Sequence, residues 1–458
     1  MHEWTEQTEQ LAADVMAYAR ERLHMRPPPL DGPRAPEELR ADAGPTITPD
    51  GIGGTEALRI FADVLAPACI STDHPRYFSF IPCAPTPAST LFDLVVGASS
   101  IYGGSWMEGA GAVYAENEAL AWLAGLAGFP ETAGGVFVQG GTIGNVSALI
   151  AARHRDAVRR LTEERPPPAR YAVAASVEAH SSISSAAHAM DIDVIGVTPD
   201  EEGRLTGAAL DGALDRSSTA HPGREPFAVV ATAGTTNLGI VDDLESVSAV
   251  ARRRGLWLHV DGAYGAAGLA APSRRALFNG IETADSFVVD PHKWLFAPFD
   301  CAALIYRDPG AGYEAHSQHA AYLEPLRTGH DWSPSDYALQ LTRRARGLPF
   351  WFSLASHGTD AYSAAIEQTL RVAEHAARRV REIDHLELIG EPPLSVVAFR
   401  RTGWTEARYY EWSAELLMSG TAFVVPTTHA GEVAIRVAIV NPRSTTADVD
   451  VVLDSLAD

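Results

Sequence analysis

A lysine and an aspartate in the middle of the chain carry the side chains with the clearest chemical potential. Lys293 lies in the tetrapeptide PHKW at residues 291–294, and Asp261 lies earlier, in HVDGAY at residues 259–264. Each has a simple structural explanation when taken alone, Lys293 as a surface residue with a buried stem and Asp261 as the end of a strand. An amine can hold an aldehyde as an imine, and an acid can keep a ring nitrogen protonated. Together the two residues favour a site for pyridoxal 5'-phosphate, which needs both groups.

A pair of glycines could meet the third need of that cofactor, backbone donors for its phosphate. Residues 134–138 predict a strand and residues 143–153 predict a helix. Gly140, Gly141 and Thr142 would then lie at a helix N-terminus, where free amides bind anions. An ordinary tight turn is the simpler explanation of this loop by itself, because no Walker or dinucleotide fingerprint is present.

The middle of the chain alternates between strands and helices. Residues 227–232 and 256–260 predict buried strands, and residues 241–254 predict the helix that joins them. This alternation predicts an α/β fold with a mostly parallel sheet. Thr236, Asp261 and the segment before Lys293 would lie on loops that leave one edge of it.

The two ends of the chain have different patterns. Residues 5–24 predict a helix that a proline-rich connector follows, which is typical of an arm. A long helix at 362–383 and short strands near 395–399 and 433–439 predict a small α+β domain. We therefore expect three units: an N-terminal helical arm and dimerisation segment at 1–75, a large cofactor-binding domain at 76–345, and a small C-terminal domain at 346–458.

Composition narrows the class of protein. The chain has 458 residues, 46% of them hydrophobic, and a formal net charge of -22, which argues against a nucleic-acid partner. No apolar run is long enough to cross a bilayer. The three cysteines have no spacing typical of a disulfide framework or a zinc site. We expect a cytoplasmic enzyme with a small-molecule substrate, no bound metal and no membrane partner.

Seven motifs in order give the chain a family resemblance. They are HPRYF at 74–78, GGVF at 134–137 leading to GGT at 140–142, EAHSS at 178–182, AGTT at 233–236, VDGAY at 260–264, DSF at 285–287 leading to PHKW, and Arg436 followed by VNPR at 440–443. The chain resembles the group II pyridoxal-phosphate-dependent amino-acid decarboxylases, of the aromatic-L-amino-acid and glutamate decarboxylase type. The resemblance implies the aspartate-aminotransferase-like fold (fold type I) and a homodimer whose active site is shared across the interface.

The resemblance also implies roles for single residues at the cofactor. Lys293 would form the imine, Asp261 would pair with the pyridinium nitrogen and His180 would stack on the ring. Further cofactor contacts are expected from Gly141, Thr142, Thr236, Ala263, Asp290 and His292. Many relatives have asparagine at position 290, so the carboxylate of Asp290 is a mild departure at a phosphate site.

The resemblance places the substrate pocket at two further segments. The first is Phe80, Ile81, Pro82 and Cys83, and the second, lent by the partner subunit, is 101–106, with Tyr102, Gly104 and Trp106 as candidate contacts. Glycines at 103 and 104 stand where aromatic-specific relatives often carry bulky apolar residues, which indicates a differently shaped pocket. Core packing explains these apolar positions equally well.

The catalytic loop at 322–344 leaves the last step of the reaction open. Relatives present a proton-donating tyrosine there. This chain has Tyr322 and Tyr337, but the aligned position falls near Ser333 or Pro334. The other candidate donors are His316, His319 and His330.

These observations lead to three hypotheses. The first is decarboxylation of an L-amino acid, aromatic or specialised, through an external aldimine to an amine. The second keeps the cofactor but ends in oxidative deamination to an aldehyde, or in β-elimination on an amino-acid conjugate, in a biosynthetic pathway. The third is a non-catalytic binding relative that keeps the fold.

Overall fold

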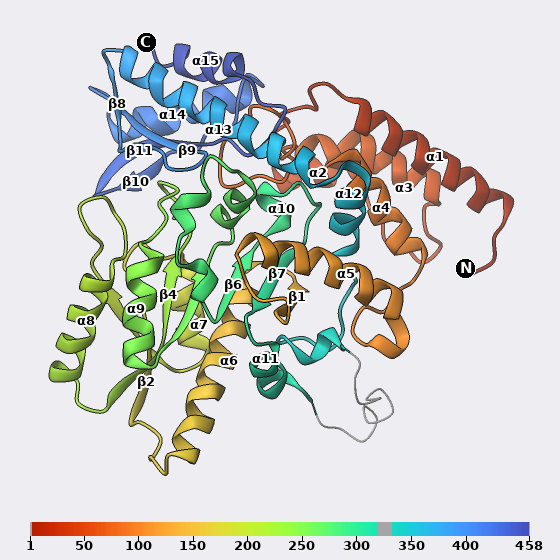
Figure 1. The fold of residues 1–458 in the computed structure, drawn as a ribbon. Coiled ribbons are helices and arrows are strands. Elements are labelled where there is room, and N and C mark those ends of the chain that lie inside the picture. Colours follow the sequence, from red (N-terminus) through yellow and green to blue (C-terminus); the bar gives the residue numbers. More distant parts are fainter. Residues whose placement is uncertain (1, 319–331, 458) are drawn as a thin grey trace.

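A seven-stranded sheet forms the centre of the molecule (Figure 1). The computed structural model describes residues 2–318 and 332–457. Strand order in the sheet is β1-β7-β6-β5-β4-β2-β3, and only β7 runs antiparallel to its neighbours, which confirms the mostly parallel sheet. The strands are β1 (Gly134–Val138), β2 (Arg170–Ser176), β3 (Asp193–Val197), β4 (Arg224–Thr232), β5 (Trp257–Asp261), β6 (Ser286–Val289) and β7 (Ala302–Tyr306).

Both faces of this sheet are buried, as strand β4 shows. Val229 and Ala231 pack into one hydrophobic cluster, while Ala228 and Val230 pack into another, because successive side chains of a strand point to opposite faces. The first cluster includes residues of α5 (Trp106–Leu126), α8 (Gly207–Ala220) and α9 (Leu244–Arg254), and the second includes residues of α6 (Gly141–Thr162) and α7 (Ser181–Ala189). Covering both faces with helices explains why the strand sequences are almost continuously apolar.

The C-terminal part is built on a second, antiparallel sheet. It has the strand order β10-β11-β9-β8, with β8 (Leu386–Leu388), β9 (Val396–Arg401), β10 (Thr427–His429) and β11 (Glu432–Ala438). Helices α13 (Thr359–Glu382), α14 (Glu406–Met418) and α15 (Thr446–Asp454) share a hydrophobic cluster with this sheet. The predicted small α+β domain is therefore confirmed.

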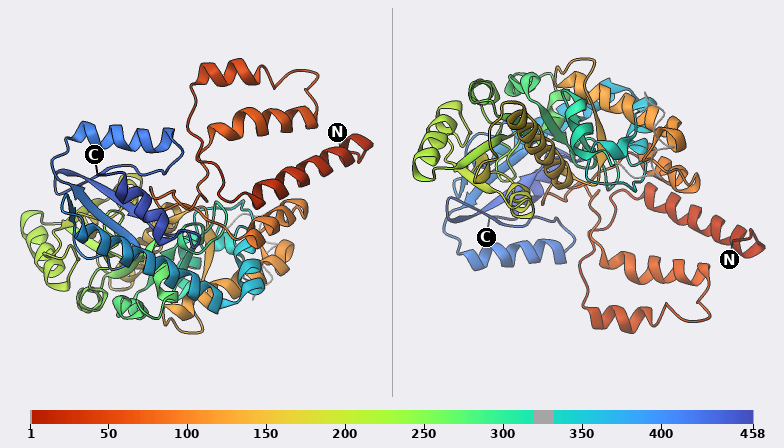
Figure 2. Two further views of the ribbon diagram at one scale, coloured as in Figure 1. Left: turned by 90° about the horizontal axis from the view of Figure 1, so that it is seen from above. Right: turned by 90° about the horizontal axis from the view of Figure 1, so that it is seen from below.

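The N-terminal helices stand away from the rest of the molecule (Figure 2). They are α1 (Glu6–His24), α2 (Pro36–Ala43) and α3 (Gly54–Ile60), and neither α1 nor α2 has a buried residue. Helices α4 (Pro87–Ala98) and α12 (Leu348–His357) pack against each other beside α5. The predicted arm is present, while the three-way division at residues 75 and 345 stays a prediction.

The start of α5 and the length of α6 each have a local cause. Helix α5 begins at Trp106, where the Ser105 hydroxyl accepts from the Glu108 amide as an N-cap. Helix α6 continues beyond residue 153 to Thr162, because the buried ion pair of Asp156 and Arg160 lets a charged segment stay helical. Among the described residues no helix is both long and apolar enough to span a bilayer.

Candidate functional site

Three strand ends bring the predicted cofactor residues to one edge of the sheet. Strand β5 ends at Asp261, and β6 leads through Asp290 into the short helix α10 (Pro291–Trp294), which carries Lys293. Strand β1 leads to Gly140, the N-cap residue of α6. Because β1, β5 and β6 point the same way, their carboxyl ends form the crevice where α/β sheets bind ligands.

Lys293 and the glycine loop meet at the Asp290 carboxylate. The Lys293 Nζ lies 2.9 Å from Asp290 Oδ2, and the Gly141 amide donates to the same oxygen at 3.2 Å. Asp290 is 1% exposed, and its Oδ1 has no hydrogen-bond partner among the described residues. Lys293 is also the one lysine among the 36 Lys and Arg residues of the chain, so no other side-chain amine could hold an aldehyde.

Close packing explains why position 141 is a glycine. A Cβ added there would lie 2.8 Å from the Cβ of Ala263 and 3.2 Å from both oxygens of Asp290. The backbone at the start of α6 is therefore in contact with the residues that follow β5 and β6. Thr142 is exposed in the first turn of the same helix, where backbone amides and the helix dipole favour an anion.

Asp261 is fixed by two hydrogen bonds. Its Oδ2 accepts from Asn145 Nδ2 at 2.8 Å, and its Oδ1 accepts from the Ala263 amide at 3.2 Å. Asp261 is 5% exposed and Asn145, on α6, is 1% exposed. Asn145 therefore holds the carboxylate in one orientation at the strand end.

Asn145 also belongs to a longer chain of buried hydrogen bonds. The His259 Nε2–H donates to Asn145 Oδ1 at 2.9 Å, and His259 Nδ1 accepts from the Ser286 hydroxyl at 2.8 Å. Asn145 Nδ2 donates to Ser182 Oγ at 2.9 Å. Complete burial lowers the pKa of His259 to about 4, so this imidazole is neutral near pH 7.

The chain of hydrogen bonds ends at His180, the N-cap residue of α7. His180 Nδ1 accepts from both the amide and the hydroxyl of Ser182, at 3.1 and 2.9 Å. The ring hydrogen of His180 is therefore on Nε2, and the imidazole is exposed at the sheet edge. The His180 imidazole is a planar group that can stack on a ring. It is linked through Ser182 to Asn145, the residue that holds Asp261.

Arg436 joins the small domain to this edge. Its Nε donates to the Thr236 carbonyl at 2.6 Å and its Nη1 to the Phe80 carbonyl at 2.8 Å. Its Nη2 is buried without a hydrogen-bond partner among the described residues. Burial lowers the pKa of Arg436 to about 10, which leaves the guanidinium charged near pH 7. Thr236 itself is exposed, as a ring-lining residue would be.

The residues around Lys293 are firmly packed. Trp294 stacks on Tyr264 with ring centroids 5.3 Å apart and donates through Nε1 to Thr369 Oγ1 at 2.9 Å. His292 is 8% exposed; its Nδ1 accepts from the Cys301 amide at 3.0 Å, and burial lowers its pKa. Helix α10 is thereby held between the large sheet and α13.

The first predicted substrate segment divides into packed and open residues. Cys83 is buried and donates from Sγ to the Ala297 carbonyl at 3.0 Å; burial raises the pKa of its thiol to about 12. Pro82 is buried and Ile81 packs against the main core. Phe80, by contrast, is 62% exposed and has a φ of 53°. Of these four residues only Phe80 has a mostly exposed side chain, and its carbonyl accepts from Arg436.

The second predicted substrate segment packs on the residues after the catalytic loop. The Tyr102 hydroxyl donates to the Leu341 carbonyl at 2.9 Å, and the Trp106 amide donates to Ser333 Oγ at 3.4 Å. A Cβ at Gly104 would overlap the Tyr102 ring. Within one chain, the described hydrogen bonds tie this segment to residues 333–343 and not to Phe80.

The candidate proton donors that can be located are engaged elsewhere. Tyr337 is 9% exposed and stacks on Trp332 with centroids 3.9 Å apart; burial raises the pKa of its phenol. The buried His316 donates from Nε2 to the Ser147 carbonyl at 3.0 Å. Pro334 is buried. Tyr322, His319 and His330 lie outside the described residues.

Sequence reasoning missed the buried support of the site. Periodicity places Asn145 in a helix and His259 in a strand and gives neither a role. A polar residue inside an apolar run nevertheless signals that its side chain needs a hydrogen-bond partner. The number of lysines is a stronger signal for the cofactor site, because Lys293 is the one lysine of the chain and so the one side-chain amine that could hold the aldehyde.

The arrangement fits pyridoxal phosphate. It offers an amine at Lys293, a fixed carboxylate at Asp261, an exposed imidazole at His180 and the amides at the start of α6. Each comes from the same edge of the sheet, so one cofactor could contact all of them.

Comparison with known proteins agrees with this chemistry. The protein-family model described as "Pyridoxal-dependent decarboxylase conserved domain" matches residues 54–402 of the chain. The chain is 33% identical over 420 residues to an L-2,4-diaminobutyrate decarboxylase of Rhizobium meliloti, covering 88% of this chain and 82% of that protein. It is 27% identical over 437 residues to an aromatic-L-amino-acid decarboxylase of Bacillus atrophaeus, covering 93% of this chain and 89% of that protein.

Solved structures share the fold over nearly the whole chain. The crystal structure of mouse CSAD has a TM-score of 0.88 at 25% identity and covers 98% of this chain and 97% of that chain. Oryza sativa TDC, solved with PLP and tryptamine, has a TM-score of 0.88 at 24% identity and covers 98% of this chain and 96% of that chain. Family, fold and site agree: the chain belongs to the pyridoxal-dependent decarboxylases and is a pyridoxal-phosphate-dependent carboxy-lyase that acts on amino acids.

Proposed function

We propose that the enzyme decarboxylates an aromatic L-amino acid to the corresponding amine. The observation that carries this proposal is the meeting of Lys293, Asp261 and the glycine loop at one edge of the sheet, with the exposed ring of Phe299 next to His292. The matched family and the curated relatives are decarboxylases, which favours this outcome over an aldehyde or a β-elimination product.

The proposed cofactor roles follow from the donor set. Bound pyridoxal phosphate supplies an electron sink for the bond that breaks. Lys293 would hold its aldehyde, and Asp261, whose carboxylate Asn145 fixes, would keep its ring nitrogen protonated. His180, Thr236 and Ala263 would contact the ring.

The proposed phosphate site is the start of α6, with Gly141 and Thr142 as donors and His292 nearby. We assign Asp290 a different role from the phosphate contact predicted for it. Its carboxylate is paired with the Lys293 ammonium and accepts from the Gly141 amide. A cofactor phosphate at the Gly141 amide would repel the Asp290 carboxylate, because both are anions. Asp290 is therefore better suited to hold the Lys293 amine in place.

The substrate side of the proposal rests on Arg436 and two phenyl rings. The buried Nη2 of Arg436 has no partner among the described residues, so it can donate to a carboxylate. Phe80 and Phe299 are 62% and 55% exposed, and the Phe299 ring lies 5.1 Å from His292. Exposed rings beside a polar cofactor site suit an aromatic side chain, which gains from stacking as well as burial.

L-2,4-Diaminobutyrate is the second candidate, because a decarboxylase of that substrate is 33% identical to this chain. Its side-chain ammonium would need a carboxylate in the pocket. Asp300, the acid closest in sequence to Phe299, already forms an ion pair with Arg346. This engagement disfavours a cationic substrate relative to an aromatic one.

We also propose that the enzyme is a homodimer with partner residues at each active site. Helices α1 and α2 have no buried residue, and a long helix with no buried face is not stable in isolation. Leu91, Leu94 and Val95 on α4 are each nearly half exposed. Light scattering should give a mass near twice the 48.9 kDa of one chain; a monomeric, fully active enzyme would contradict this part of the proposal.

We infer a reducing compartment, the cytoplasm, because Cys69, Cys83 and Cys301 are all free thiols. Titration of unfolded, unreduced protein with a thiol reagent should count all three. Recovery of the enzyme in a secreted fraction would contradict the inference.

The decisive experiment is product analysis. The yellow holoenzyme is incubated with L-phenylalanine, L-tyrosine, L-tryptophan, L-histidine, L-glutamate and L-2,4-diaminobutyrate, and products are identified by mass spectrometry with parallel oxygen uptake. We expect an aromatic amine with no oxygen uptake, and no amine from Lys293→Ala. An aldehyde with oxygen uptake would overturn the proposed outcome, and a preference for diaminobutyrate would overturn the proposed substrate class.

A further inference from the structure

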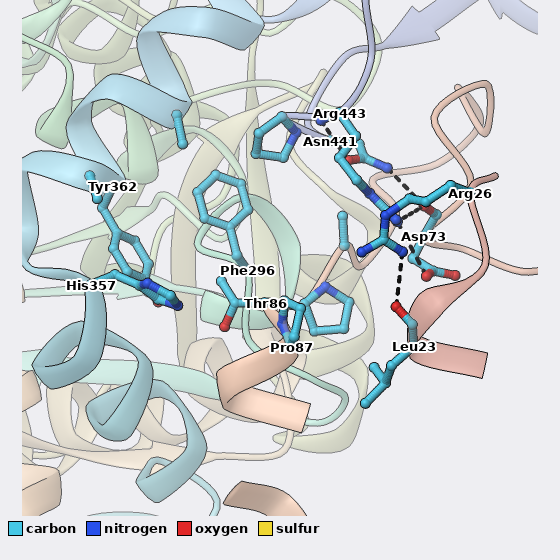
Figure 3. A pocket seen from close by; sticks show the side chains of 15 residues that line it. Leu23, Arg26, Asp73, Thr86, Pro87, Phe296, His357, Tyr362, Asn441 and Arg443 are labelled. Atoms are coloured by element: carbon cyan, nitrogen blue, oxygen red, sulfur yellow. Dashed lines mark hydrogen bonds and ion pairs between the residues drawn. The ribbon is translucent and has the colours of Figure 1, made fainter. Parts of the chain in front are cut away.

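A cavity of about 300 Å³ lies where the N-terminal arm meets the rest of the molecule (Figure 3). None of the residues that line it is among those named at the Lys293 edge, and five segments far apart in sequence enclose it. Its walls are Leu23 in the last turn of α1 and Arg26 just after that helix, residues 84–87 at the start of α4, Phe296 after α10, residues 357–365 around the α12–α13 junction, and residues 441–443, with Asp73 at the rim.

One end of the cavity is polar (Figure 3). Asp73 is bonded to Arg22 at 2.7 Å and to Arg443 at 3.3 Å, so its charge is already shared between two arginines. The guanidinium of Arg26 donates only to backbone carbonyls, those of Leu23 at 2.9 Å and Met25 at 2.7 Å. Among the described residues Arg26 has no carboxylate within ion-pair distance.

The other end is apolar. The rings of Phe296 and Tyr362 face it, and Pro87 lies near them (Figure 3). The alanines at 361 and 365 also line the cavity. The Tyr362 hydroxyl donates to Ser353 Oγ at 2.6 Å. The Asn441 amide donates to the Asp73 carbonyl and accepts from the Arg443 amide. These polar groups are already satisfied, so apart from the His357 imidazole beside Tyr362 this end offers ring faces and methyl groups (Figure 3).

We propose that this cavity binds a small amphipathic carboxylate, with the carboxylate on Arg26 and a single apolar ring between Phe296 and Tyr362. Two physical reasons select this class of ligand. A guanidinium without a carboxylate partner in a chain of net charge -22 attracts one anionic group, which it can bind through two parallel hydrogen bonds. The volume and the apolar walls match the lower range of small-molecule sites. One unpaired guanidinium suits a carboxylate better than a dianionic phosphate.

Occupancy would connect three parts of the molecule. The ligand would touch the arm at Arg26, the segment after Lys293 at Phe296, and α13 at Ala365. A ligand that binds only the folded arrangement raises its stability by mass action. The melting temperature of the holoenzyme should therefore rise with ligand concentration.

The test uses 3-phenylpropanoate as the probe and its neutral amide, 3-phenylpropanamide, as the matched comparison. Calorimetric titration of the dimeric holoenzyme should show binding of the acid at least about ten-fold tighter than the amide, as expected for a charge-assisted contact. Arg26→Gln should weaken binding of the acid by a similar factor. Arg20→Gln removes an exposed arginine of α1 that lies outside the cavity, and this variant should bind the acid as the wild type does.

A second variant keeps the proposal testable if Arg26→Gln perturbs the arm. Ala365→Trp fills the apolar end and should abolish binding, while Ala364→Trp on the same helix points away from the lining and should not. Equal affinity in Arg26→Gln and Arg20→Gln would place the probe elsewhere, for example at the Lys293 edge, and would overturn the proposal. No binding by the wild type would also overturn it, because the partner subunit then fills the cavity or nothing does.

Discussion

The cofactor half and the substrate half of the site are built in different ways. The cofactor half, Lys293, Asp261 and Gly141, lies on the ends of strands and the start of a helix, each held by buried hydrogen bonds. The substrate half, residues 80–83 and 101–106, lies on loops up to Trp106, the first residue of α5. Strands within one sheet position side chains through a shared ladder, whereas loops depend on what packs against them.

Residue exposure shows the same difference. Asp261, Asn145 and Asp290 are at most 5% exposed, while Phe80 is 62% exposed at a left-handed backbone conformation. A phenylalanine at positive φ stores strain that the surrounding structure must offset. The cofactor half is thus pre-organised, and the substrate half is the part that another subunit or a substrate completes.

Removing the amine of the cofactor half should have the largest effect. We expect Lys293→Ala to lose activity by on the order of 10⁴-fold, because no other lysine can hold the aldehyde. Lys293→Arg keeps a cation beside Asp290 and should be equally inactive, which separates imine chemistry from charge. The readout is amine production together with borohydride reduction, which should label the wild type once and neither variant. A variant that keeps more than a tenth of the wild-type rate would contradict the assignment.

Removing the support beneath Asp261 should have a smaller effect. Asn145→Leu deletes the donor to Asp261 and the acceptor for His259, so both are left unsatisfied in a buried position. We expect kcat to fall by roughly 10- to 100-fold and the free energy of unfolding by about 1–3 kcal/mol. Val146→Leu, one residue along α6, serves as the control. Unchanged kcat with reduced stability would make Asn145 a structural residue only.

A change in the substrate half should act mainly on binding. Phe80→Ala removes the exposed ring of a residue whose carbonyl accepts from Arg436, and we expect KM for the preferred aromatic substrate to rise by about 5- to 20-fold from lost burial and stacking. The kcat value and the visible spectrum of the bound cofactor should change little. A fall in kcat with constant KM would show that the two halves are not separable at this residue.

The last expected effect is on the free energy of unfolding as a function of pH and not on the reaction. Burial lowers the pKa of His259 to about 4, below the 6.5 of an unfolded histidine, so the unfolded chain binds more protons between these values. The contribution of His259 is therefore present above pH 6.5 and is lost as pH falls towards 4, by up to about 3 kcal/mol.

Comparison with His259→Gln isolates this contribution from other groups. Asp242 acts in the opposite direction: burial raises its pKa to about 7, so its cost is relieved as pH falls. Asp242 is present in both the wild type and His259→Gln, so its contribution cancels in the difference between their free energies of unfolding. The measurement is denaturant unfolding of both proteins from pH 4 to pH 7; parallel stability curves would mean that His259 is not neutral when folded.

Most of the fold could be predicted from periodicity. The strands 134–138 and 256–260 and the helices 5–24 and 362–383 were expected within a few residues of their positions in the structure. Long, strongly periodic segments allow this because their buried faces repeat. The length of α6 was underestimated, because the ion pair of Asp156 and Arg160 is a local compensation that hydrophobic spacing does not reveal.

The sequence by itself determined the fold class, the cofactor chemistry and the residues that supply it, because Lys293, Asp261 and the glycine loop follow recognisable strands. Only the tertiary structure decided what supports them. Asn145 and His259 come from α6 and β5, and their hydrogen bonds exist only once the helix packs on the sheet. The arm cavity likewise depends on segments more than 400 residues apart, Leu23 and Arg443, which no local pattern connects.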